Sequence, residues 1–516
     1  MIMLWSILRS LASKPAANPA GAVRGTGLET GIACFNAQDF AGASRDLSAA
    51  LDAEPDNFVA AYYLALAAAH SGRLERAQEL LEAACARRND ADAHSALGNV
   101  YRLQGRAADA EQSYRRALAV DAGHLTALAN LGLSLRDRGV PREALLLLDR
   151  ALKLAPNHVE AIFNKALVLT DLGEREAAAA LIERVLALDP NFAEAHLQRG
   201  FSQLKQGNFA AGWDEYAWRT RIPEVDHWQE YAYPHWQGEA LEGKRLLVQA
   251  EQGLGDQIMF ASCLPDLLPR ARHTVLECDP RLARLFARSF PPAVVYRHRV
   301  EGAPDWSGEA APDYRVRMGD LPRIMRRSKA DFPAHRGYLL ADAAQVAAWR
   351  ARLDALGRGL KVGVSWRGGT PGTGQAARSL ALDALLPLLR LPRAHFISLQ
   401  YGAVGAEIAD LRVRHGIVLH EWSQADAAMD GVAALIASLD LVITVCTTAV
   451  HLSGALGKPA WVMVPAVAEW RYLETGAHLP WYPALRLFRQ QNPGAWDGVV
   501  ADVRTELVRE IDAAYG

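Results

Sequence analysis

The sequence predicts an α-helical repeat array followed by an α/β region with two parallel sheets. A glycine recurs every 33 or 34 residues between positions 72 and 207, which is typical of stacked helix pairs. After residue 245, short runs rich in Val, Ile and Leu alternate with longer amphipathic stretches, which indicates parallel strands joined by helices. These runs form two clusters, at about 245–335 and 360–490. We therefore expect two doubly wound lobes after the repeats.

The repeat is marked by small residues at fixed spacing. The glycines are Gly72, Gly105, Gly139, Gly173 and Gly207, the prolines in phase are Pro55, Pro156 and Pro190, and the recurring alanines are Ala77, Ala110, Ala144 and Ala177. This pattern resembles the tetratricopeptide repeat, a pair of antiparallel helices with a glycine at the turn. About six units would cover residues 28–219. One unit cannot bury its apolar face alone, so the units are expected to stack into a superhelix with a concave groove.

Three asparagines recur within the array, namely Asn99, Asn130 and Asn164. An amide offers both a donor and an acceptor, so these side chains could bind an extended peptide backbone in the groove. They could equally bond only to neighbouring turns of the array. Grooves of this class usually hold protein segments, so we expect a protein partner. A rigid spacer or a dimerisation surface is the alternative.

Composition suggests the remaining boundaries. We expect a flexible N-terminus at 1–27, an aromatic linker at 220–244, a first lobe at 245–345 and a second lobe at 346–516. The linker is dense in Trp, Tyr and Pro. Such a segment can stack on sugars or bases, but it more often packs one domain against the next, and we favour the packing role.

The stretch AEQGLGDQIMF at 250–260 follows the first expected strand and opens a helix. Its glycines, Gly253 and Gly255, let the backbone approach a ligand, and ligands bind at the carboxyl ends of strands in such sheets. Asp256 could simply cap the helix. A dinucleotide site is a second possibility because Glu277 ends the next strand. However, Ile258 stands where GxGxxG requires its third glycine.

Several blocks resemble the bacterial proteins that join tetratricopeptide repeats to a heptosyltransferase-like glycosyltransferase domain. These blocks are EQGLGDQIMF, VGVSWRGGTPG followed by ARSLAL, ISLQYG, DLVITVCTTAVHLSGALGKPAWVMVP, EWRYL and PWYPALRLFRQ, and they span most of 234–490. The resemblance implies a GT-B fold, which has two Rossmann-like lobes. It also implies that a nucleotide sugar binds in the cleft between the lobes, mainly to the C-terminal one.

The resemblance also implies roles for individual residues. Asp256 would act as the general base that accepts the proton of the acceptor hydroxyl. The residues assigned to the donor are Gly253, Gly255, Gln257, Trp366, Arg367, Arg378, Ser379, Gln400, Thr447, Thr448, His451, Glu469 and Arg471. Those between 366 and 379 belong to a glycine-rich loop that would stabilise the leaving phosphate. Those between 447 and 451 open a helix and would contact the phosphates and the sugar.

One position departs from the family. Relatives commonly carry Asp where this chain has Cys446, and that Asp is expected to position donor hydroxyls or orient the loop. The change is compatible with weakened activity or with a different sugar nucleotide. Glu469 could accept hydrogen bonds from sugar hydroxyls, and Arg471 could pair with a charged donor group.

The charge, the cysteines and the apolar runs of the sequence argue against several other classes of protein. The formal net charge of −2 gives no global attraction for nucleic acid or an anionic membrane. The five cysteines are scattered and form no CxxC pair, which indicates neither a disulfide framework nor a zinc site. No uncharged apolar run reaches ~18 residues, so no transmembrane helix is expected. The short apolar run at the N-terminus contains Arg9 and lacks a basic region before it, which disfavours a secretion signal. We expect a cytoplasmic protein.

The combined prediction is an inverting glycosyltransferase that moves a sugar from a UDP-, GDP-, ADP-, TDP- or CMP-linked donor to an acceptor hydroxyl. No cofactor beyond this co-substrate is expected, and no metal, because no DxD-like pair accompanies the donor block. The repeat arm suggests a protein acceptor, with a Ser or Thr of flagellin as one example. The alternative is a repeat scaffold whose α/β region binds nucleotide without catalysis, and Cys446 favours it.

Overall fold

The computed structural model describes residues 26–222, 230–299, 304–369, 374–422 and 429–515. The expected flexible N-terminus therefore lies almost wholly outside the described residues. Packing divides the chain into two compact units. The first comprises Met1–His196 with Thr220–Val225, and the second comprises Leu197–Arg219 with Asp226–Gly516.

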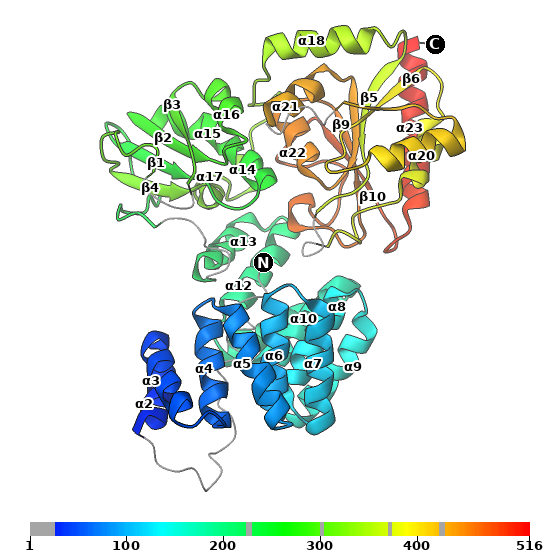
Figure 1. The fold of residues 1–516 in the computed structure, drawn as a ribbon. Helices are drawn as coiled ribbons and strands as arrows, with labels where there is room; N and C mark the ends of the chain where they lie inside the picture. The colour runs from blue at the N-terminus through cyan, green and yellow to red at the C-terminus, as the bar shows by residue number, and fades with distance from the viewer. Residues whose placement is uncertain (1–25, 223–229, 300–303, 370–373, 423–428, 516) are drawn as a thin grey trace. The chain divides into compact units, whose positions relative to one another are not determined.

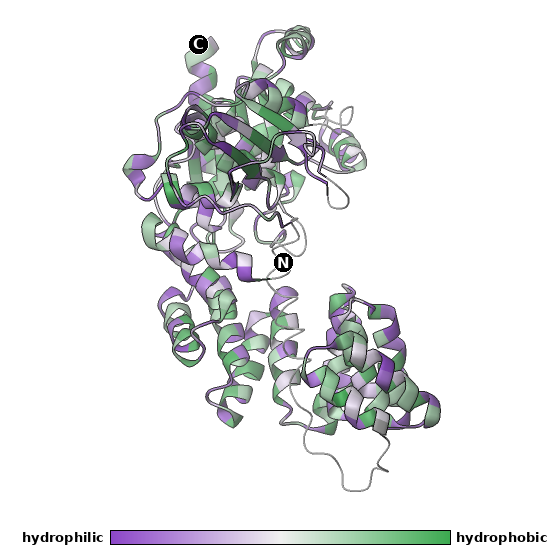
Figure 2. Cartoon of the chain, turned by 90° about the vertical axis from the view of Figure 1, so that its left-hand side faces the viewer, coloured by the Kyte–Doolittle hydropathy of each residue, from purple (hydrophilic) through white to green (hydrophobic). Residues whose placement is uncertain are grey.

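The first unit is a series of antiparallel helix pairs (Figure 1). The pairs are α2 (Thr26–Asn36) with α3 (Phe40–Ala53), α4 (Phe58–His70) with α5 (Leu74–Arg87), α6 (Ala91–Leu103) with α7 (Ala107–Val120), α8 (Leu125–Asp137) with α9 (Pro141–Leu154), and α10 (Val159–Leu172) with α11 (Arg175–Leu188). In Figure 2 these helices carry both hydrophobic and hydrophilic residues, as expected for helices that bury one face in a stack.

The five repeat glycines occupy the turns within the pairs, as the spacing predicts. Their φ angles lie between 73° and 84°, in the left-handed region that favours glycine. The alanines at 77, 110 and 144 are fully buried where the helices meet. The fourth alanine prediction is wrong by one residue, because Ala178 is buried whereas Ala177 is exposed. Four consecutive alanines follow Glu176, so composition could not fix the register there.

The sixth helix pair packs differently from the others. It consists of α12 (Ala193–Lys205) and α13 (Phe209–Tyr216), followed by the 3₁₀ turn η1 (Ala217–Arg221). From Leu197 to Arg219 this segment belongs to the second unit. The indole of Trp213 is buried and donates to the carbonyl of Arg326 at 2.9 Å. The repeat pattern therefore continues in sequence beyond the point where packing changes units.

The second unit begins with a four-stranded parallel sheet. Its strands are β1 (Arg245–Gln249), β2 (His273–Cys278), β3 (Ala293–Arg297) and β4 (Tyr314–Arg317), in the order β3-β2-β1-β4. The helices of this lobe are α14 (Leu254–Phe260), α15 (Leu264–Leu267), α16 (Ala283–Ser289) and α17 (Leu321–Met325). The strand order reverses direction between β1 and β4, where such sheets form a crevice.

A six-stranded parallel sheet forms the other lobe. Its strands are β5 (Leu360–Ser365), β6 (Ala394–Ser398), β7 (Leu419–Glu421), β8 (Leu441–Val445), β9 (Ala460–Val464) and β10 (Leu485–Arg489), in the order β10-β9-β8-β5-β6-β7. The helices are α18 (Ala343–Asp354), α19 (Leu386–Leu389), α20 (Gly405–His415), α21 (Met429–Ser438), α22 (Thr448–Ala455) and α23 (Trp496–Tyr515). The order reverses between β5 and β8, so the two predicted strand clusters are two parallel sheets with a crevice each.

The described part of the aromatic linker packs on the first sheet. The ring of Tyr231 lies 5.0 Å from that of Trp306, and the backbone of His235 bridges to Arg315 beside β4. Tyr231 and Trp306 also donate to Glu277, at 2.8 Å and 2.6 Å. Because the Glu277 carboxylate is buried under these rings, it has no access to a ribose, which argues against the dinucleotide interpretation.

Two further features concern the chain as a whole. Within the described ranges, no helix combines the length and hydrophobicity needed to cross a bilayer. All five cysteines are unpaired thiols.

Candidate functional site

The crevice of the second sheet lies where the loops after β5 and β8 meet. A Cβ atom on Gly368 would lie 2.5 Å from the carbonyl oxygen of Cys446, so only glycine permits this approach. The amide of Gly368 donates to the hydroxyl of Ser379 at 3.1 Å. Gly368 thus brings the glycine-rich loop against the residues that open α22.

Gln400 fixes the first turn of the glycine-rich loop. Its carbonyl oxygen accepts from the amides of Trp366 and Arg367 at 2.9 Å and 2.8 Å, and its amide nitrogen donates to the Arg367 carbonyl at 3.1 Å. Trp366 is fully buried and Gln400 nearly so. These two residues therefore shape the loop from beneath rather than present groups to a ligand.

Arg367 and Arg378 have different partners. Arg367 pairs with Glu407 on α20 at 2.5 Å, and the indole of Trp366 donates to the same carboxylate at 3.2 Å. Arg378 pairs with Glu469 at 2.5 Å, after the end of β9. Arg378 therefore lies among the residues of the crevice, whereas Arg367 is held by α20.

Helix α22 begins at the end of β8. Thr447 caps it, since its hydroxyl accepts from the amide of Ala449 at 3.2 Å. Behind the cap, Thr444 lies 2.6 Å from Ser365 of β5 and 3.1 Å from Thr447, measured between hydroxyl oxygens. Thr447 and Thr448 are half-buried. A hydroxyl pair at a helix N-terminus suits an anion such as a phosphate.

His451 is one turn further along α22 and is buried. Its Nδ1 lies 3.0 Å from the hydroxyl of Tyr482, and its ring packs against Gly255, where a Cβ would lie 2.9 Å from Cδ2. Burial lowers the pKa of His451 to about 4, with Arg471 acting in the same direction and Asp256 opposing it. The imidazole is therefore neutral at neutral pH and brings α14 close to α22.

A chain of ion pairs joins the two lobes at this point. Arg471 donates to Asp256 from Nε at 2.8 Å and also from Nη2, and it pairs with Glu469 at 3.2 Å. Glu469 in turn holds Arg378. Asp256 belongs to α14 of the first lobe, whereas Arg471 belongs to η9 (Trp470–Tyr472) of the second. The side chains of Asp256 and Arg471 each remain 17% exposed, so solvent reaches the pair.

The turn that carries Asp256 is held from within. Gln257 is buried, donates to the carbonyl of Gln252 at 3.2 Å and accepts from the amide of Asp279 at 2.9 Å. Gly253 is the N-cap residue of α14, and Gly255 permits the approach of His451. Three of the residues assigned to the donor thus shape this turn.

Cys446 lies in the floor of the second crevice. Burial raises the pKa of its thiol to about 12, and the nearby Glu469 carboxylate acts in the same direction. Its sulfur lies 4.0 Å from the carbonyl of Met463 in β9. The protonated thiol serves here as a small apolar group, not as a nucleophile.

The three repeat asparagines lie inside the array. Asn130 donates to the Asn99 side chain at 2.7 Å, Tyr114 donates to the same oxygen at 2.7 Å, and Asn164 donates to the Ala129 carbonyl at 3.2 Å. All three amides are at most 5% exposed. The expectation that they contact a peptide is therefore replaced by a structural role, because they link α6 to α8 and α8 to α10.

The predicted site residues fall into three groups. Those that converge around the ion chain and α22 are Asp256, Arg378, Thr447, Thr448, His451, Glu469 and Arg471. Those that shape the surrounding turns are Gly253, Gly255, Gln257, Trp366, Ser379 and Gln400, while Arg367 is paired with α20. Sequence reasoning missed Tyr482 as the partner of His451, although the PWYP block containing it had been noted. Among the described residues, no group of three or more His, Cys, Asp or Glu side chains is gathered as a metal site.

Comparison with known proteins identifies the repeats. Family models described as tetratricopeptide repeat match residues 35–100, 93–126, 129–191 and 163–217. The N-terminal region consists of tetratricopeptide repeats. The last match includes α12 and α13, so the helix pair that packs with the second unit is a repeat by sequence.

The chain also resembles Protein FlbA of Caulobacter vibrioides, with 34% identity over 319 residues, which is 59% of this chain and 53% of that protein. The chain thus spans about half the length of this curated relative. Solved structures are similar to about a third of the chain. The MamA protein is 22% identical to this chain, with a TM-score of 0.28. The match covers 33% of this chain and 92% of MamA. YrrB is 18% identical, with a TM-score of 0.28, and the match covers 34% of this chain and 90% of YrrB. A thermophilic tetratricopeptide repeat protein of Thermus thermophilus is 20% identical, with a TM-score of 0.30, and the match covers 33% of this chain and 94% of that protein.

Proposed function

We propose that the second unit is an inverting glycosyltransferase of the GT-B type, which transfers a sugar from a nucleotide donor to a hydroxyl of a protein recruited by the repeats. The observation that carries the proposal is the convergence of groups from two parallel sheets. Asp256 from the first lobe meets Arg471, Glu469 and Arg378 from the second. The N-terminus of α22 opens beside the same crevice.

The chemistry follows from these groups. Asp256 accepts the proton of the acceptor hydroxyl as its oxygen forms a bond to the anomeric carbon of the sugar. The bond from that carbon to the donor phosphate breaks, and its electron pair leaves with the nucleotide, which is a nucleoside diphosphate or, for a CMP-linked donor, CMP. Arg378 and the α22 end, with Thr447 and Thr448, stabilise the negative charge that develops on the phosphate. Positive side chains and backbone amides can do this without a metal ion.

The Asp256–Arg471 pair gives the reaction an order. While the pair persists, the Asp256 oxygen is occupied by the Arg471 guanidinium and is not free to accept the proton of an acceptor hydroxyl. A donor phosphate is a competing anion for Arg471. Donor binding therefore releases Asp256 to the acceptor, so the donor binds before the acceptor.

The proposal is tested by incubating the purified protein with a panel of nucleotide sugars, with water as the acceptor, and measuring the slow hydrolysis that releases the nucleoside diphosphate, or CMP from a CMP-linked donor. One donor class is expected to be turned over, and Asp256→Asn should lower the rate by about 10²- to 10⁴-fold, the usual contribution of a general base. The matched control is Asp313→Asn. Asp313 accepts from the amide of Arg245 at the opposite end of β1, so its loss should leave the rate unchanged.

A second candidate function is a scaffold that binds nucleotide without turnover. Two features favour it: the pairing of Asp256 with Arg471, and the buried thiol of Cys446 at a position where the resemblance to the heptosyltransferase-like family implies Asp. The same panel separates the two functions. Nucleotide-induced stabilisation with no turnover of any donor would support the scaffold and end the transferase proposal.

A further inference from the structure

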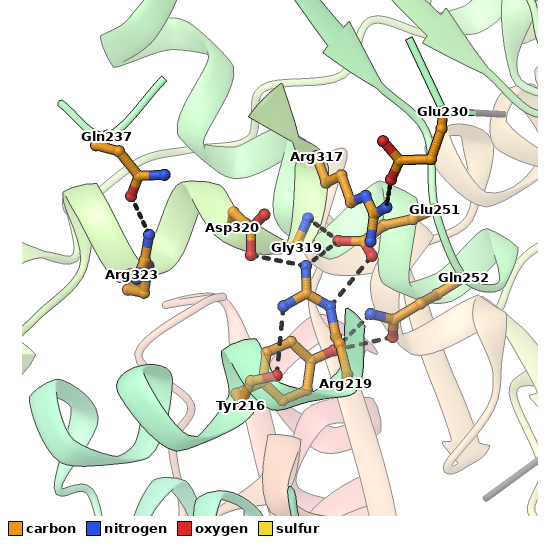
Figure 3. A network of polar contacts seen from close by, with 10 residues as sticks. All are labelled: Tyr216, Arg219, Glu230, Gln237, Glu251, Gln252, Arg317, Gly319, Asp320 and Arg323. Atoms are coloured by element: carbon orange, nitrogen blue, oxygen red, sulfur yellow. Dashed lines mark hydrogen bonds and ion pairs between the residues drawn. The ribbon is translucent and has the colours of Figure 1, made fainter. Parts of the chain in front are cut away.

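The crevice of the first sheet is filled by the chain itself. Arg219 from η1 inserts between the loops that follow β1 and β4 (Figure 3). Its Nη2 donates to Glu251 at 2.6 Å and lies 2.9 Å from Asp320, and its Nε donates to the other Glu251 oxygen at 3.1 Å. Arg219 is 2% exposed and Glu251 is 3% exposed. A position that binds ligands in many such sheets is here closed by a buried ion network.

Backbone geometry shows how closely the network is built. The amide of Gly319, in the 3₁₀ turn η4 (Met318–Asp320) that follows β4, donates to Glu251 at 2.6 Å. A Cβ atom on Gly319 would lie 2.1 Å from that carboxylate oxygen, so the network leaves no room for a side chain there. Glu251 lies two residues after the end of β1 and accepts from both η1 and η4. These donors fix the start of the turn that follows β1.

The next residue, Gln252, is held by α13 of the sixth helix pair. The Tyr216 hydroxyl, at the end of α13, lies 2.9 Å from Oε1 and 2.6 Å from Nε2 of Gln252. Gln252 has a φ of 62°, a conformation that a residue with a side chain rarely adopts without support from its surroundings. Its carbonyl accepts from Gln257, on the far side of the turn. Residues 251 and 252, which lead into the turn of Asp256, are thus both fixed by the segment that ends the repeats.

The same segment also contacts Trp470, the neighbour of Arg471, which is the ion-pair partner of Asp256. Trp470 precedes Arg471, and its ring lies 5.5 Å from Trp213, 5.7 Å from Tyr216 and 6.4 Å from Phe201, measured between centroids. The Arg471 guanidinium lies over the Trp470 ring at 4.7 Å. The sixth helix pair thus contacts Gln252, in the turn that leads to Asp256, and Trp470, the residue before Arg471.

We propose that Tyr216 and Arg219 are positioning residues for the catalytic turn, so that the last repeat is part of the transferase unit rather than of the recognition arm. Tyr216 orients the turn through Gln252, and Arg219 orients it through Glu251. Together they set where the Asp256 carboxylate stands relative to Arg471. The catalytic consequence of this proposal rests on the proposed function, whereas its effect on the turn does not.

The test uses the full chain with Tyr216→Phe and Arg219→Lys, each with a matched control in the same lobe. Tyr231→Phe removes a hydroxyl that bonds Glu277, and Arg326→Lys alters a buried arginine that pairs with Asp266, both away from the turn. Hydrogen exchange of the amides from 252 to 257 and steady-state kinetics are measured for all four. Tyr216→Phe decides the test if Arg219→Lys does not fold.

We expect faster exchange in the turn for both test variants and not for the controls. We also expect kcat to fall about five- to tenfold with the donor KM unchanged, the size that follows from one lost hydrogen bond. Unaltered exchange in the turn, or equal losses of kcat in the controls, would overturn the proposal. A wild-type protein that turns over no donor would instead refute the proposed function, and the exchange result would still decide the positioning role.

Discussion

In the first sheet, the crevice between β1 and β4 holds the guanidinium of Arg219 with Glu251 and Asp320 around it. In the second sheet, the corresponding crevice between β5 and β8 is lined by Gly368, Thr447 and the buried thiol of Cys446. Both crevices arise from the same reversal of strand order. The difference shows that topology places a crevice, whereas the side chains at the strand ends decide whether it is a structural joint or a ligand site.

The largest expected effect tests the first crevice as a structural joint. Arg219→Met leaves Glu251 and Asp320 without their shared cation, and breaking a buried pair in this way costs about 3–5 kcal/mol. Urea denaturation of the variant should show this loss of unfolding free energy. The control is Arg486→Met, because the side chains of the Arg486–Glu506 pair are 42% and 22% exposed, so this pair should matter much less. Similar losses in both variants would mean that the first crevice has no special role.

Helix α22, which begins at the second crevice, buries the neutral imidazole of His451, whereas the first crevice buries charged groups. We therefore expect acid to lower the stability through His451. His451 has a pKa of about 4 in the folded protein, below its ordinary value of 6.5. As the pH falls below 6.5, His451 is protonated in the unfolded chain but stays neutral in the folded chain. The contribution of His451 to the free energy of unfolding therefore decreases until about pH 4, where the folded form is protonated as well. The loss is about 3 kcal/mol over this window. Comparing denaturation curves of wild type and His451→Gln between pH 7 and 4 isolates it, and parallel pH slopes would contradict it.

A smaller effect is expected where the second crevice is closest packed. Gly368→Ala places a methyl group against the Cys446 carbonyl, and overpacking of this kind costs about 1–3 kcal/mol. Because the displaced loops are those proposed to grip the phosphates, nucleotide affinity should fall about 10- to 100-fold, measured as a reduced thermal shift. Gly498→Ala is the control, since its Cβ would enter open space. An unchanged thermal shift in Gly368→Ala would separate this loop from nucleotide binding.

The smallest effect concerns the repeats of the first unit. Tyr114→Phe removes one buried hydroxyl bond to Asn99 and should cost about 1 kcal/mol. Thermal denaturation measures this loss, and donor turnover should be unaltered. A change in turnover would mean that the internal contacts of the repeats influence catalysis, which would blur the distinction drawn between the sixth pair and the others.

The architecture was largely readable from the sequence because it is periodic. A glycine that must adopt a positive φ every 34 residues marks each turn, and apolar runs between helices mark parallel strands. Register within a run of identical residues was not readable, as Ala177 and Ala178 illustrate. Asn99, Asn130 and Asn164 were also ambiguous, because an amide in a groove and an amide between helices have the same sequence pattern.

The candidate site was readable only in part. The motifs named Asp256, Glu469 and Arg471, but the pairing of Asp256 with Arg471 joins positions 215 residues apart and no local pattern contains it. Arg219 was missed for a related reason. A charged residue after a helix usually lies in solvent, and only the tertiary contact with Glu251 reveals its role.

The most direct test of the central claim is a structure of the protein with a bound nucleotide, chosen by thermal-shift screening of UDP, GDP, ADP, TDP and CMP. We expect the phosphates to lie at the carboxyl ends of β5 and β8, against Thr447 and Arg378, with Arg471 drawn from Asp256 toward them. Phosphates bound at the ends of β1 and β4, in place of Arg219, would contradict it.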